Sequence, residues 1–338
     1  FTLAEEGDYT GLLKDTDSLD EALPYIEARP GIAAAAKDVL AGPEPEIITG
    51  DHCTSPFLCE FRDYCNRGSS EPEWPINLLP NTGKKVAAKW AEQGVVDLTH
   101  VPDGSFTNPV HAKIHSATCT IKVFHDVLGA KEATTDWSWP RSYLDFETIA
   151  FVIPRWLGTR PWQQVPFQFS LHIEGEGGEL DHKEFLSLDG QDPRRACAEA
   201  LISMIPDTGA VITYNAGFER SCIKQLAERF PDLEPTLSKI SARIVDLLPV
   251  TRNHWYHRDQ RGSWSIKAVL PTISGEAGYE ALAVQDGFAA QMAYLRAIAP
   301  DCGPVEGEQI ARELKDYCSL DTSAMVMLLR HLIGVDRT

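Results

Sequence analysis

The 338-residue sequence lacks any apolar run long enough to span a membrane, and its N-terminus has neither the basic region nor the apolar core of a signal peptide. These absences predict a cytoplasmic protein with no membrane partner. Positive charge is also scarce, because 31 Lys and Arg residues against 49 Asp and Glu residues give a formal net charge of −18. Non-specific binding to nucleic acid depends on many Lys and Arg contacts with phosphate, so the composition argues against it. An acidic chain can still act on nucleic acid through metal ions, which bridge carboxylates to phosphate oxygens.

The eight cysteines do not have the pattern of a secreted disulfide framework. Four of them are scattered through apparent core segments, and we expect buried, reduced thiols there: Cys197, Cys222, Cys302 and Cys318.

With 43% hydrophobic and 24% charged residues, the composition is that of a soluble globular protein, and the length suffices for two domains. The chain starts on Phe1 rather than on Met, so we expect that a further domain precedes it.

Three other cysteines lie close together in the first part of the chain. Cys53, Cys59 and Cys65 are each separated by five intervening residues and stand among Pro and aromatic residues. Several thiolates in one short segment suit an Fe–S cluster or Zn²⁺, and either group needs one more ligand. His52, Cys119 or a cysteine in a preceding part of the protein can supply it, and the spacing does not choose among them. The alternative interpretation is a compact loop with free cysteines.

This segment belongs to a predicted N-terminal domain that is mainly helical and covers residues 1–135. Two helical patterns, at 18–23 and 32–40, precede the cysteines, and a short basic helix is expected over 84–93. We place the domain boundary near residue 135, so that the second domain covers 136–338.

The second domain opens on Tyr143-Leu-Asp145-Phe-Glu147-Thr, an apolar segment of strand character that carries two acids separated by one residue. Strand side chains alternate between faces, so Asp145 and Glu147 point the same way. No cation stands within three residues of either acid, so the two acids raise each other's pKa or share a divalent metal ion. We interpret the segment as a metal-binding strand. A solvated strand face without chemistry is the alternative.

The elements that follow predict an α/β fold with a mixed sheet flanked by helices. A three-stranded antiparallel meander should run from the acidic strand through a strand at 165–174 to a third strand that ends at 188, with a hairpin turn at 175–178. Helices and short strands then alternate, which is a pattern of the ribonuclease H kind. The expected elements are helices at 193–205, 216–229 and 308–332 and strands at 210–214 and 243–246.

Three motifs in order over about residues 140–333 resemble the DnaQ-like DEDD 3′→5′ exonuclease superfamily, in its tyrosine subgroup. Asp145 and Glu147 match the Asp-x-Glu of the first strand. Tyr214-Asn-Ala-Gly-Phe-Glu219 matches the second motif, although the family acid is usually Asp, and Tyr317-Cys-Ser-Leu-Asp321 matches the third. Each motif alone is weak, but the three together are fairly specific.

The resemblance implies phosphodiester hydrolysis with two Mg²⁺ or Mn²⁺ ions held by the four carboxylates of Asp145, Glu147, Glu219 and Asp321. Such oxygen ligands suit both metals, and a two-metal site activates water and stabilises the leaving oxygen. Tyr317 lies one helical turn before Asp321 and so shares its face, where the resemblance implies that its hydroxyl orients the attacking water. Asp246 is expected to act as a cap or a supporting residue rather than as a ligand.

Single-stranded nucleic acid is the expected partner, because cations mixed with aromatic residues are typical of backbone contact and base stacking. The two segments with this composition are 252–267 and 156–162. A disordered basic loop is the alternative for the first, and packing of the aromatic residues against the cysteine domain is the alternative for the second. The candidate contact residues are Trp156, Arg160, Asn215, Phe218, Arg258, Arg261 and Lys267.

The half-motif Cys59-Glu-Phe-Arg-Asp-Tyr-Cys65 resembles the last element of the Fe–S motif of RecB-like and CRISPR-associated nucleases, with a longer preceding gap. The whole order of motifs resembles an uncharacterised bacterial family whose longer members carry a RecB-like nuclease domain in front. The sequence therefore predicts a metal-dependent 3′→5′ exonuclease for single-stranded ends, DNA rather than RNA. The rival prediction is a nucleic-acid-binding or assembly module that keeps the fold without turnover.

Overall fold

The computed structural model describes residues 1–47, 49–53, 55, 57–67, 72–81, 83–275, 278–279 and 282–335. By contacts the chain forms two compact units: Tyr9–Glu73 is one, and Phe1–Asp8 with Trp74–Thr338 is the other. None of the helices that these residues form is long and apolar enough to cross a membrane. We call the larger of the two the sheet unit and the smaller the cysteine unit.

The described residues of the cysteine unit form one long helix, a 3-10 turn and one short helix: α1 (Leu19–Ala41), η1 (Asp51–Cys53) and α2 (Arg62–Cys65). The expectation of two separate helical patterns before the cysteines was wrong, because α1 is continuous and includes Pro24 and Pro30. Its second half is rich in alanine, the strongest helix former, which favours continuation despite the prolines. No residue of α1 is buried, so local propensity rather than packing accounts for this helix.

The sheet unit is built on a five-stranded mixed sheet in the order β4-β3-β2-β5-β6. The antiparallel pairs β2–β3 and β3–β4 confirm the predicted meander, and β5 and β6 run parallel to β2 beside it. Short apolar β5 is buried at every residue, as a central parallel strand requires. The strands are β2 (Arg141–Ala150), β3 (Gln164–Glu174), β4 (Leu180–Leu186), β5 (Val211–Thr213) and β6 (Ile244–Asp246).

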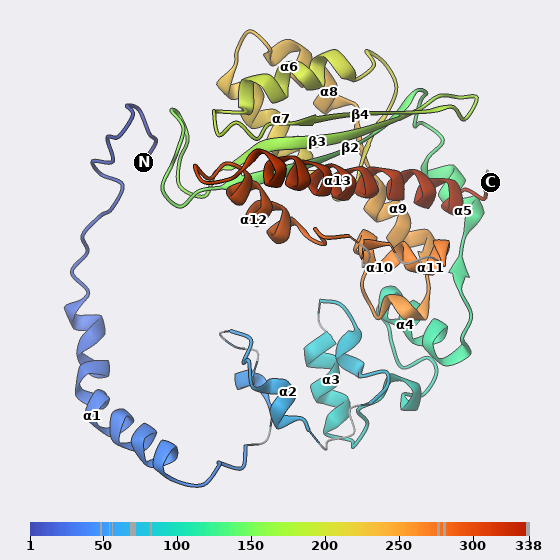
Figure 1. The fold of residues 1–338 in the computed structure, drawn as a ribbon. Coiled ribbons are helices and arrows are strands. Elements are labelled where there is room, and N and C mark those ends of the chain that lie inside the picture. The colour runs from blue at the N-terminus through green and yellow to red at the C-terminus, as the bar shows by residue number, and fades with distance from the viewer. Residues whose placement is uncertain are drawn as a thin grey trace. The chain divides into compact units, whose positions relative to one another are not determined.

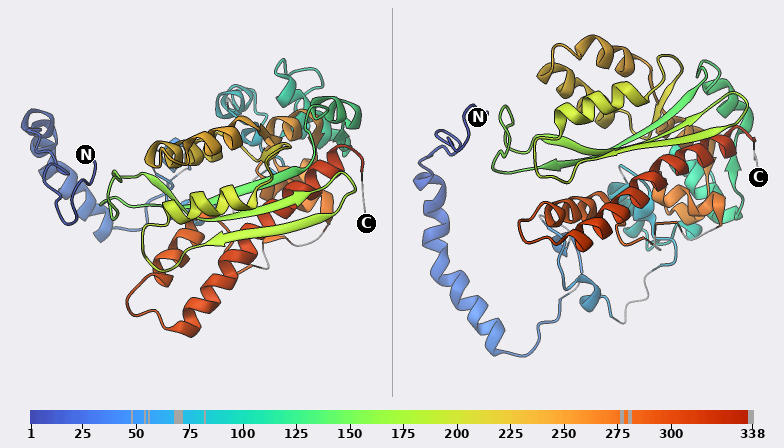
Figure 2. Two further views of the ribbon diagram at one scale, coloured as in Figure 1. Left: turned by 90° about the horizontal axis from the view of Figure 1, so that it is seen from above. Right: turned by 45° about the horizontal axis from the view of Figure 1, so that its top comes forward.

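Helices cover both faces of this sheet (Figures 1 and 2). Leu144 and Phe146 of β2 point into a core formed with the helices of one face, whereas Asp145 and Glu147 alternate to the other face. One face carries α6 (Arg194–Met204), α7 (Gly217–Arg229) and α8 (Glu234–Ala242), and the other carries α12 (Gly287–Ala297) and α13 (Pro304–Leu332). The alternating strand pattern therefore separates a dry core from an acidic face.

A bulge modifies the sheet immediately after the acids. Glu147 pairs with Gln168 and Thr148 with Pro166, so Phe167 is an extra residue on β3. As a result the neighbours Phe167 and Gln168 both serve the α12 and α13 face: Phe167 stacks on Tyr294 at 4.2 Å between ring centroids, and Gln168 Nε2 donates to Leu314 O at 2.8 Å. The bulge thus joins β3 to α12 and α13 close to the acids.

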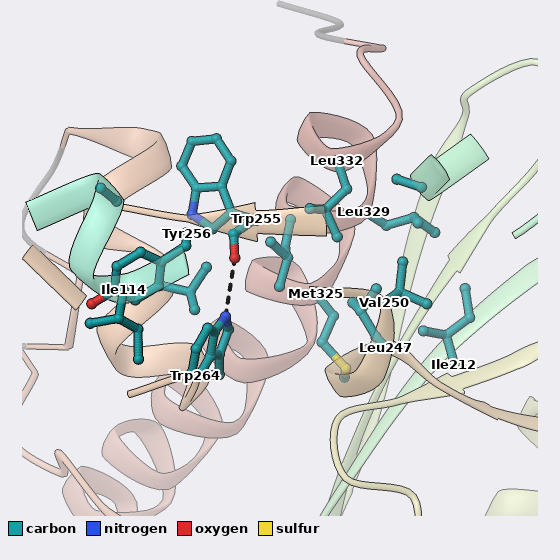
Figure 3. Packing of buried hydrophobic residues seen from close by; sticks show 14 of the residues in the cluster. Ile114, Ile212, Leu247, Val250, Trp255, Tyr256, Trp264, Met325, Leu329 and Leu332 are labelled. Atoms are coloured by element: carbon teal, nitrogen blue, oxygen red, sulfur yellow. Dashed lines mark hydrogen bonds between the residues drawn. The ribbon is translucent and has the colours of Figure 1, made fainter. Parts of the chain in front are cut away.

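Residues 74–135 pack into the same unit as the sheet (Figure 3). Ile114 shares a core with Tyr256 and Met325, and the Trp264 indole Nε1 donates to Trp255 O at 3.1 Å. The elements within residues 74–135 are η2 (Ile76–Leu78), α3 (Gly83–Ala91), η3 (Leu98–His100), α4 (Pro109–Thr120), β1 (Phe124–His125) and α5 (Val127–Ala133). Between β6 and α12 the chain forms α9 (Leu247–His254), β7 (Trp255–Tyr256), η4 (Arg258–Gln260), α10 (Ile266–Val269) and α11 (Pro271–Ser274). Packing therefore divides the chain near residue 73, and no break in packing marks the boundary expected near 135.

Candidate metal centre

Three acids from distant parts of the sequence meet on the α13 side of the sheet. Asp145, Glu147 and Asp321 each offer a carboxylate oxygen, and these atoms lie within 4.8 Å of one another. We call these three residues the acidic cluster. It is the one group of at least three potential ligands of this kind within the described ranges. The pairing of strand and helix acids that the motifs predicted is therefore present in the fold.

Local structure explains how each acid reaches the cluster. The period of two along β2 turns Asp145 and Glu147 to the same face, and α13 lies across that face with Asp321 directed inward. Tyr317 precedes Asp321 by one helical turn and is 3% exposed. Glu147 and Asp321 are each 8% exposed, and Asp145 is half-buried. The cluster is thus an interior site rather than a solvated strand face, which overturns the alternative interpretation of that strand.

Glu219 lies beside this group without being one of the three. It stands in the first turn of α7 and is 2% exposed, and its Oε2 atom is buried with no hydrogen-bond partner in the described structure. Its charge contributes to raising the pKa of Asp145, so the two carboxylates are close enough to interact. An unpartnered buried carboxylate oxygen costs free energy unless a proton or a cation meets it. Glu219 therefore remains a candidate ligand that approaches from a different element.

The electrostatics of the site favour either protons or a bound cation. Burial, reinforced by the charge of Asp321, raises the pKa of Glu147 to about 8, and burial raises that of Glu219 to about 8 as well. Burial also raises the pKa of Asp145 well above its ordinary value, with the charges of Asp321, Glu147 and Glu219 adding to the effect. A divalent ion replaces such protons, because carboxylate oxygens are the ligands that Mg²⁺ and Mn²⁺ prefer. The donor set fits these metals.

Lys267 provides a cation at the acidic cluster from a distant part of the sequence. Its Nζ atom donates to the Tyr317 hydroxyl at 3.0 Å and to Gln285 O at 2.6 Å. Its charge lowers the pKa of each member of the acidic cluster against the effect of burial. The sequence placed Lys267 among nucleic-acid contacts, whereas the structure directs it into the acidic site.

Tyr279 is a site residue that the sequence did not reveal. Its hydroxyl donates to Asp321 Oδ1 at 2.6 Å, and the residue is 7% exposed. Its ring lies 6.2 Å from that of Tyr317, centroid to centroid. Neither periodicity nor a motif marks this tyrosine, because only the tertiary fold brings Tyr279 to the cluster. Asp286, the N-cap of α12, also acts on the site, since its charge raises the pKa of Glu147.

Asp246 organises the entrance to α7, as the prediction of a cap or supporting residue indicated. Its carboxylate accepts from the backbone N–H groups of Asn215 at 3.0 Å and Ala216 at 3.1 Å, and also caps α9 by accepting from Leu248 N–H at 3.0 Å. Asn215 itself does not cap α7. Asn215 has a left-handed φ of 73°, Ala216 is the N-cap, and no side chain there caps the helix. The Asp246 carboxylate instead accepts hydrogen bonds from the backbone N–H groups at this end of the helix.

Most of the aromatic residues expected to stack on bases are buried. Trp156 is 7% exposed and packs edge-on against Phe151, while Trp255 and Trp264 are 4% and 5% exposed in the core of Figure 3. The stretch 252–267 therefore has regular structure with its tryptophans in the core, which overturns the alternative of a disordered basic loop. A tryptophan side chain is large and mostly apolar, so its burial against the neighbouring helices is more favourable than its exposure to solvent.

The remaining candidate contacts have different surroundings. Arg258 and Arg261 lie over the ring of Trp74, at 4.3 and 5.1 Å from its centroid, so their first role is a cation–π contact inside the sheet unit. Phe218 is half-buried against the core of α6, α7 and α8. Arg160 is exposed in the loop after β2, where Trp162 is 68% exposed. Arg160 and Asn215 thus remain accessible at the surface.

Cys53, Cys59 and Cys65 of the smaller unit form no disulfide bonds in the described structure. Cys53 is buried, Cys59 and Cys65 are half-buried, and Cys59 N–H donates to Cys53 O at 2.9 Å. Within the described ranges their sulfur atoms do not form a group comparable to the acidic cluster, so an Fe–S or Zn²⁺ site there stays a prediction. Among the four thiols expected to be buried, Cys302 is the exception. It is half-buried because it lies in the surface connection between α12 and α13.

This chain is similar to a family and to proteins whose names state no activity. Residues 142–265 match a family model described as a domain of unknown function, DUF2779. The matched range includes Asp145, Glu147 and Glu219 and ends before Tyr317 and Asp321. A Mycoplasma pneumoniae protein named "Uncharacterized protein MG366 homolog" is 26% identical over 207 residues, and the Mycoplasma genitalium "Uncharacterized protein MG366" is 26% identical over 209 residues. Each match covers 55% of this chain and 31% of the relative, so the chain spans less than a third of the length of these curated relatives.

Proposed function

We propose that this chain is a metal-dependent nuclease that removes nucleotides from the 3′ end of single-stranded nucleic acid. The observation that carries the proposal is the meeting of Asp145, Glu147 and Asp321 within 4.8 Å, with Tyr317 one helical turn from Asp321. Two separated sequence motifs meet in this interior cluster and a third places Glu219 beside it, which an accidental match of a single short motif would not explain. Glu219 with its unpartnered oxygen supplies the fourth carboxylate.

The fold supports the same proposal. An antiparallel meander whose first strand carries the acids, followed by two short parallel strands, is the arrangement expected for a ribonuclease H-like domain. In that comparison Asp145 and Glu147 lie on the central strand β2, and Asp321 comes from the last helix α13. A shared fold does not by itself establish chemistry, so the proposal depends on the site residues.

The residues of the site have distinct roles in this proposal. When bound, Mg²⁺ or Mn²⁺ ions would activate a water molecule and stabilise the leaving oxygen of a phosphodiester. Asp145, Glu147 and Asp321 would hold the ions, with Glu219 completing the set. The Tyr317 hydroxyl orients the attacking water, and the hydrogen bond from Tyr279 fixes the rotation of the Asp321 carboxylate. The apolar surroundings of the acids strengthen their interaction with a cation.

Single-stranded DNA is the substrate that we propose, in the cytoplasm and as one activity of a longer protein. The net charge of −18 disfavours a broad phosphate-binding surface, so recognition of a strand end at the metal site suits this chain better than binding along a duplex. Arg160, together with the exposed Trp162 beside it, is the candidate for contact with backbone and bases. A RecB-like nuclease domain preceding the cysteine unit, and an Fe–S cluster or Zn²⁺ held by that unit, complete the proposal.

A non-catalytic nucleic-acid-binding or assembly module is the second candidate. Burial of the acids favours this candidate. Glu147 and Asp321 are each 8% exposed, and Glu147 has a pKa of about 8, so it is protonated at lower pH. Such a site can remain neutral without a metal ion. This candidate predicts binding of strand ends that added metal does not convert to cleavage.

A single-stranded DNA oligonucleotide labelled at its 5′ end tests the two candidates. Wild-type protein with Mn²⁺ should give a ladder of shortened labelled products, and Asp145→Asn should abolish it at the same protein concentration. An RNA oligonucleotide of the same sequence decides between the two sugars, and a 3′ label released in the first turnover confirms the direction. Retained binding with an intact oligonucleotide under both Mg²⁺ and Mn²⁺ would move the assignment to the non-catalytic module.

A further inference from the structure

Lys267 occupies an unusual place for a lysine that was expected to contact nucleic acid. The side chain is half-buried, and its Nζ atom lies 4.8 Å from the ring centroid of Tyr317 and 5.0 Å from that of Tyr279. Nζ also donates to the Tyr317 hydroxyl oxygen at 3.0 Å and to Gln285 O at 2.6 Å. Two rings, one hydroxyl and one carbonyl therefore hold the ammonium group in a fixed position.

The chemistry of the two groups sets the direction of the hydrogen bond between them. An ammonium group has only donors, whereas a phenol has one donor and an acceptor oxygen. The Tyr317 oxygen must therefore accept from Lys267, and the single hydroxyl hydrogen of Tyr317 is left for another acceptor. Tyr317 lies one helical turn before Asp321 on α13, so the acids of the acidic cluster are the acceptors on its side of the helix. Lys267 thus determines which way the Tyr317 O–H points.

The inference rests on the proposed function, in which Tyr317 orients water at the acidic cluster. We propose that Lys267 is a positioning residue, which fixes Tyr317 as a hydrogen-bond donor toward the metal site instead of binding the phosphate backbone of the substrate. Without Lys267 the Tyr317 hydroxyl can rotate and accept hydrogen bonds in other orientations, so the attacking water is held less well. Loss of such supporting contacts typically costs about 10- to 100-fold in activity.

Three variants separate this role from a phosphate contact. Lys267→Met keeps the length of the side chain and removes the ammonium group, Lys267→Arg keeps a donor-only cation, and Lys224→Met removes an exposed lysine of α7 as a control. The kcat and KM for a 5′-labelled single-stranded DNA oligonucleotide are measured with Mn²⁺. The Mn²⁺ dissociation constant is measured separately by electron paramagnetic resonance, without any oligonucleotide.

Lys267→Met should lower kcat by about 10- to 100-fold and change KM by less than about twofold. Its Mn²⁺ affinity should stay the same or increase, since a cation has been removed from the neighbourhood of the acids. Lys267→Arg should recover most of kcat, and Lys224→Met should match the wild type. A raised KM with an unchanged kcat would instead make Lys267 a phosphate contact. A loss of Mn²⁺ affinity in parallel with kcat would make its role structural, and either result overturns the proposal.

Tyrosine labelled with ¹³C at Cζ gives a readout that does not need catalysis. Tyr317→Phe assigns the Tyr317 signal in the metal-free protein, and Lys267→Met should shift that signal while Lys267→Arg restores it. If the wild type cleaves no oligonucleotide, the proposed function fails, and this spectrum still decides the role of Lys267. An unchanged Tyr317 signal in Lys267→Met would refute the positioning role independently.

Discussion

Replacement of Glu147 by Gln should stabilise the metal-free protein at neutral pH. The residue is 8% exposed, and burial together with the charge of Asp321 raises its pKa from 4.5 to about 8. At pH 7 the folded protein therefore holds a proton on Glu147 that the unfolded chain releases. A raised pKa of this kind adds stability that is fully present below about pH 4.5 and is lost as the pH rises to about 8. Gln is neutral at every pH and avoids this loss.

The magnitude follows from the same pKa. Each pH unit between the unfolded pKa and the folded pKa changes the free energy of unfolding by about 1.4 kcal/mol. At pH 7 the wild type has thus lost about 3 kcal/mol relative to its acid form, and at pH 5 it has lost about 1 kcal/mol. The advantage of Glu147→Gln over the wild type should grow by about 2 kcal/mol between these two pH values.

Urea unfolding of chelator-treated protein, followed by tryptophan fluorescence, measures this difference. All eight tryptophans lie between Trp74 and Trp264, so the signal reports the sheet unit alone. Glu308→Gln, at an exposed position of the same helix as Asp321, is the control and should show no pH-dependent gain. The reasoning is refuted if the gap between Glu147→Gln and the wild type does not widen with pH, or if the variant is less stable at pH 7.

Four further predictions concern the metal site, the core and the cysteines. Tyr279→Phe removes the hydrogen bond to Asp321 and should weaken Mn²⁺ binding about tenfold in a calorimetric titration, whereas unchanged affinity would deny the tyrosine a role in holding the ligand. Mn²⁺ affinity of the wild type should rise with pH up to about 8, because protons on Glu147 compete with the metal; a flat profile by electron paramagnetic resonance would contradict this. Leu329→Ala, in the core of Figure 3, should lower the free energy of unfolding by about 2–5 kcal/mol in urea titrations. Cys59→Ser should remove the metal of the cysteine unit in elemental analysis of anaerobically purified protein, and an equal metal content in wild type and variant would exclude a cysteine-bound group.

The sequence by itself determined most of the local structure of the sheet unit. Alternation along β2 was sufficient to place Asp145 and Glu147 on one face, because strand geometry depends only on neighbouring residues. In the same way the helical period placed Tyr317 and Asp321 together on α13. The meander, the buried strand β5 and the long last helix followed from periodicity and turn residues. These features are local, and local propensity agrees with the fold in each case.

The tertiary structure decided what surrounds the acids. Lys267 and Tyr279 reach the acidic cluster from segments about fifty and forty residues before Tyr317 and Asp321 along the chain, and no periodicity in either segment points toward that site. The tryptophans beside Lys267 were equally ambiguous, because an aromatic side chain next to cations suits base stacking and core packing alike. Burial against α4 and α13 resolved that ambiguity. A sequence states which groups are available, whereas only the packed fold determines which of them lose water and must find a partner inside the protein.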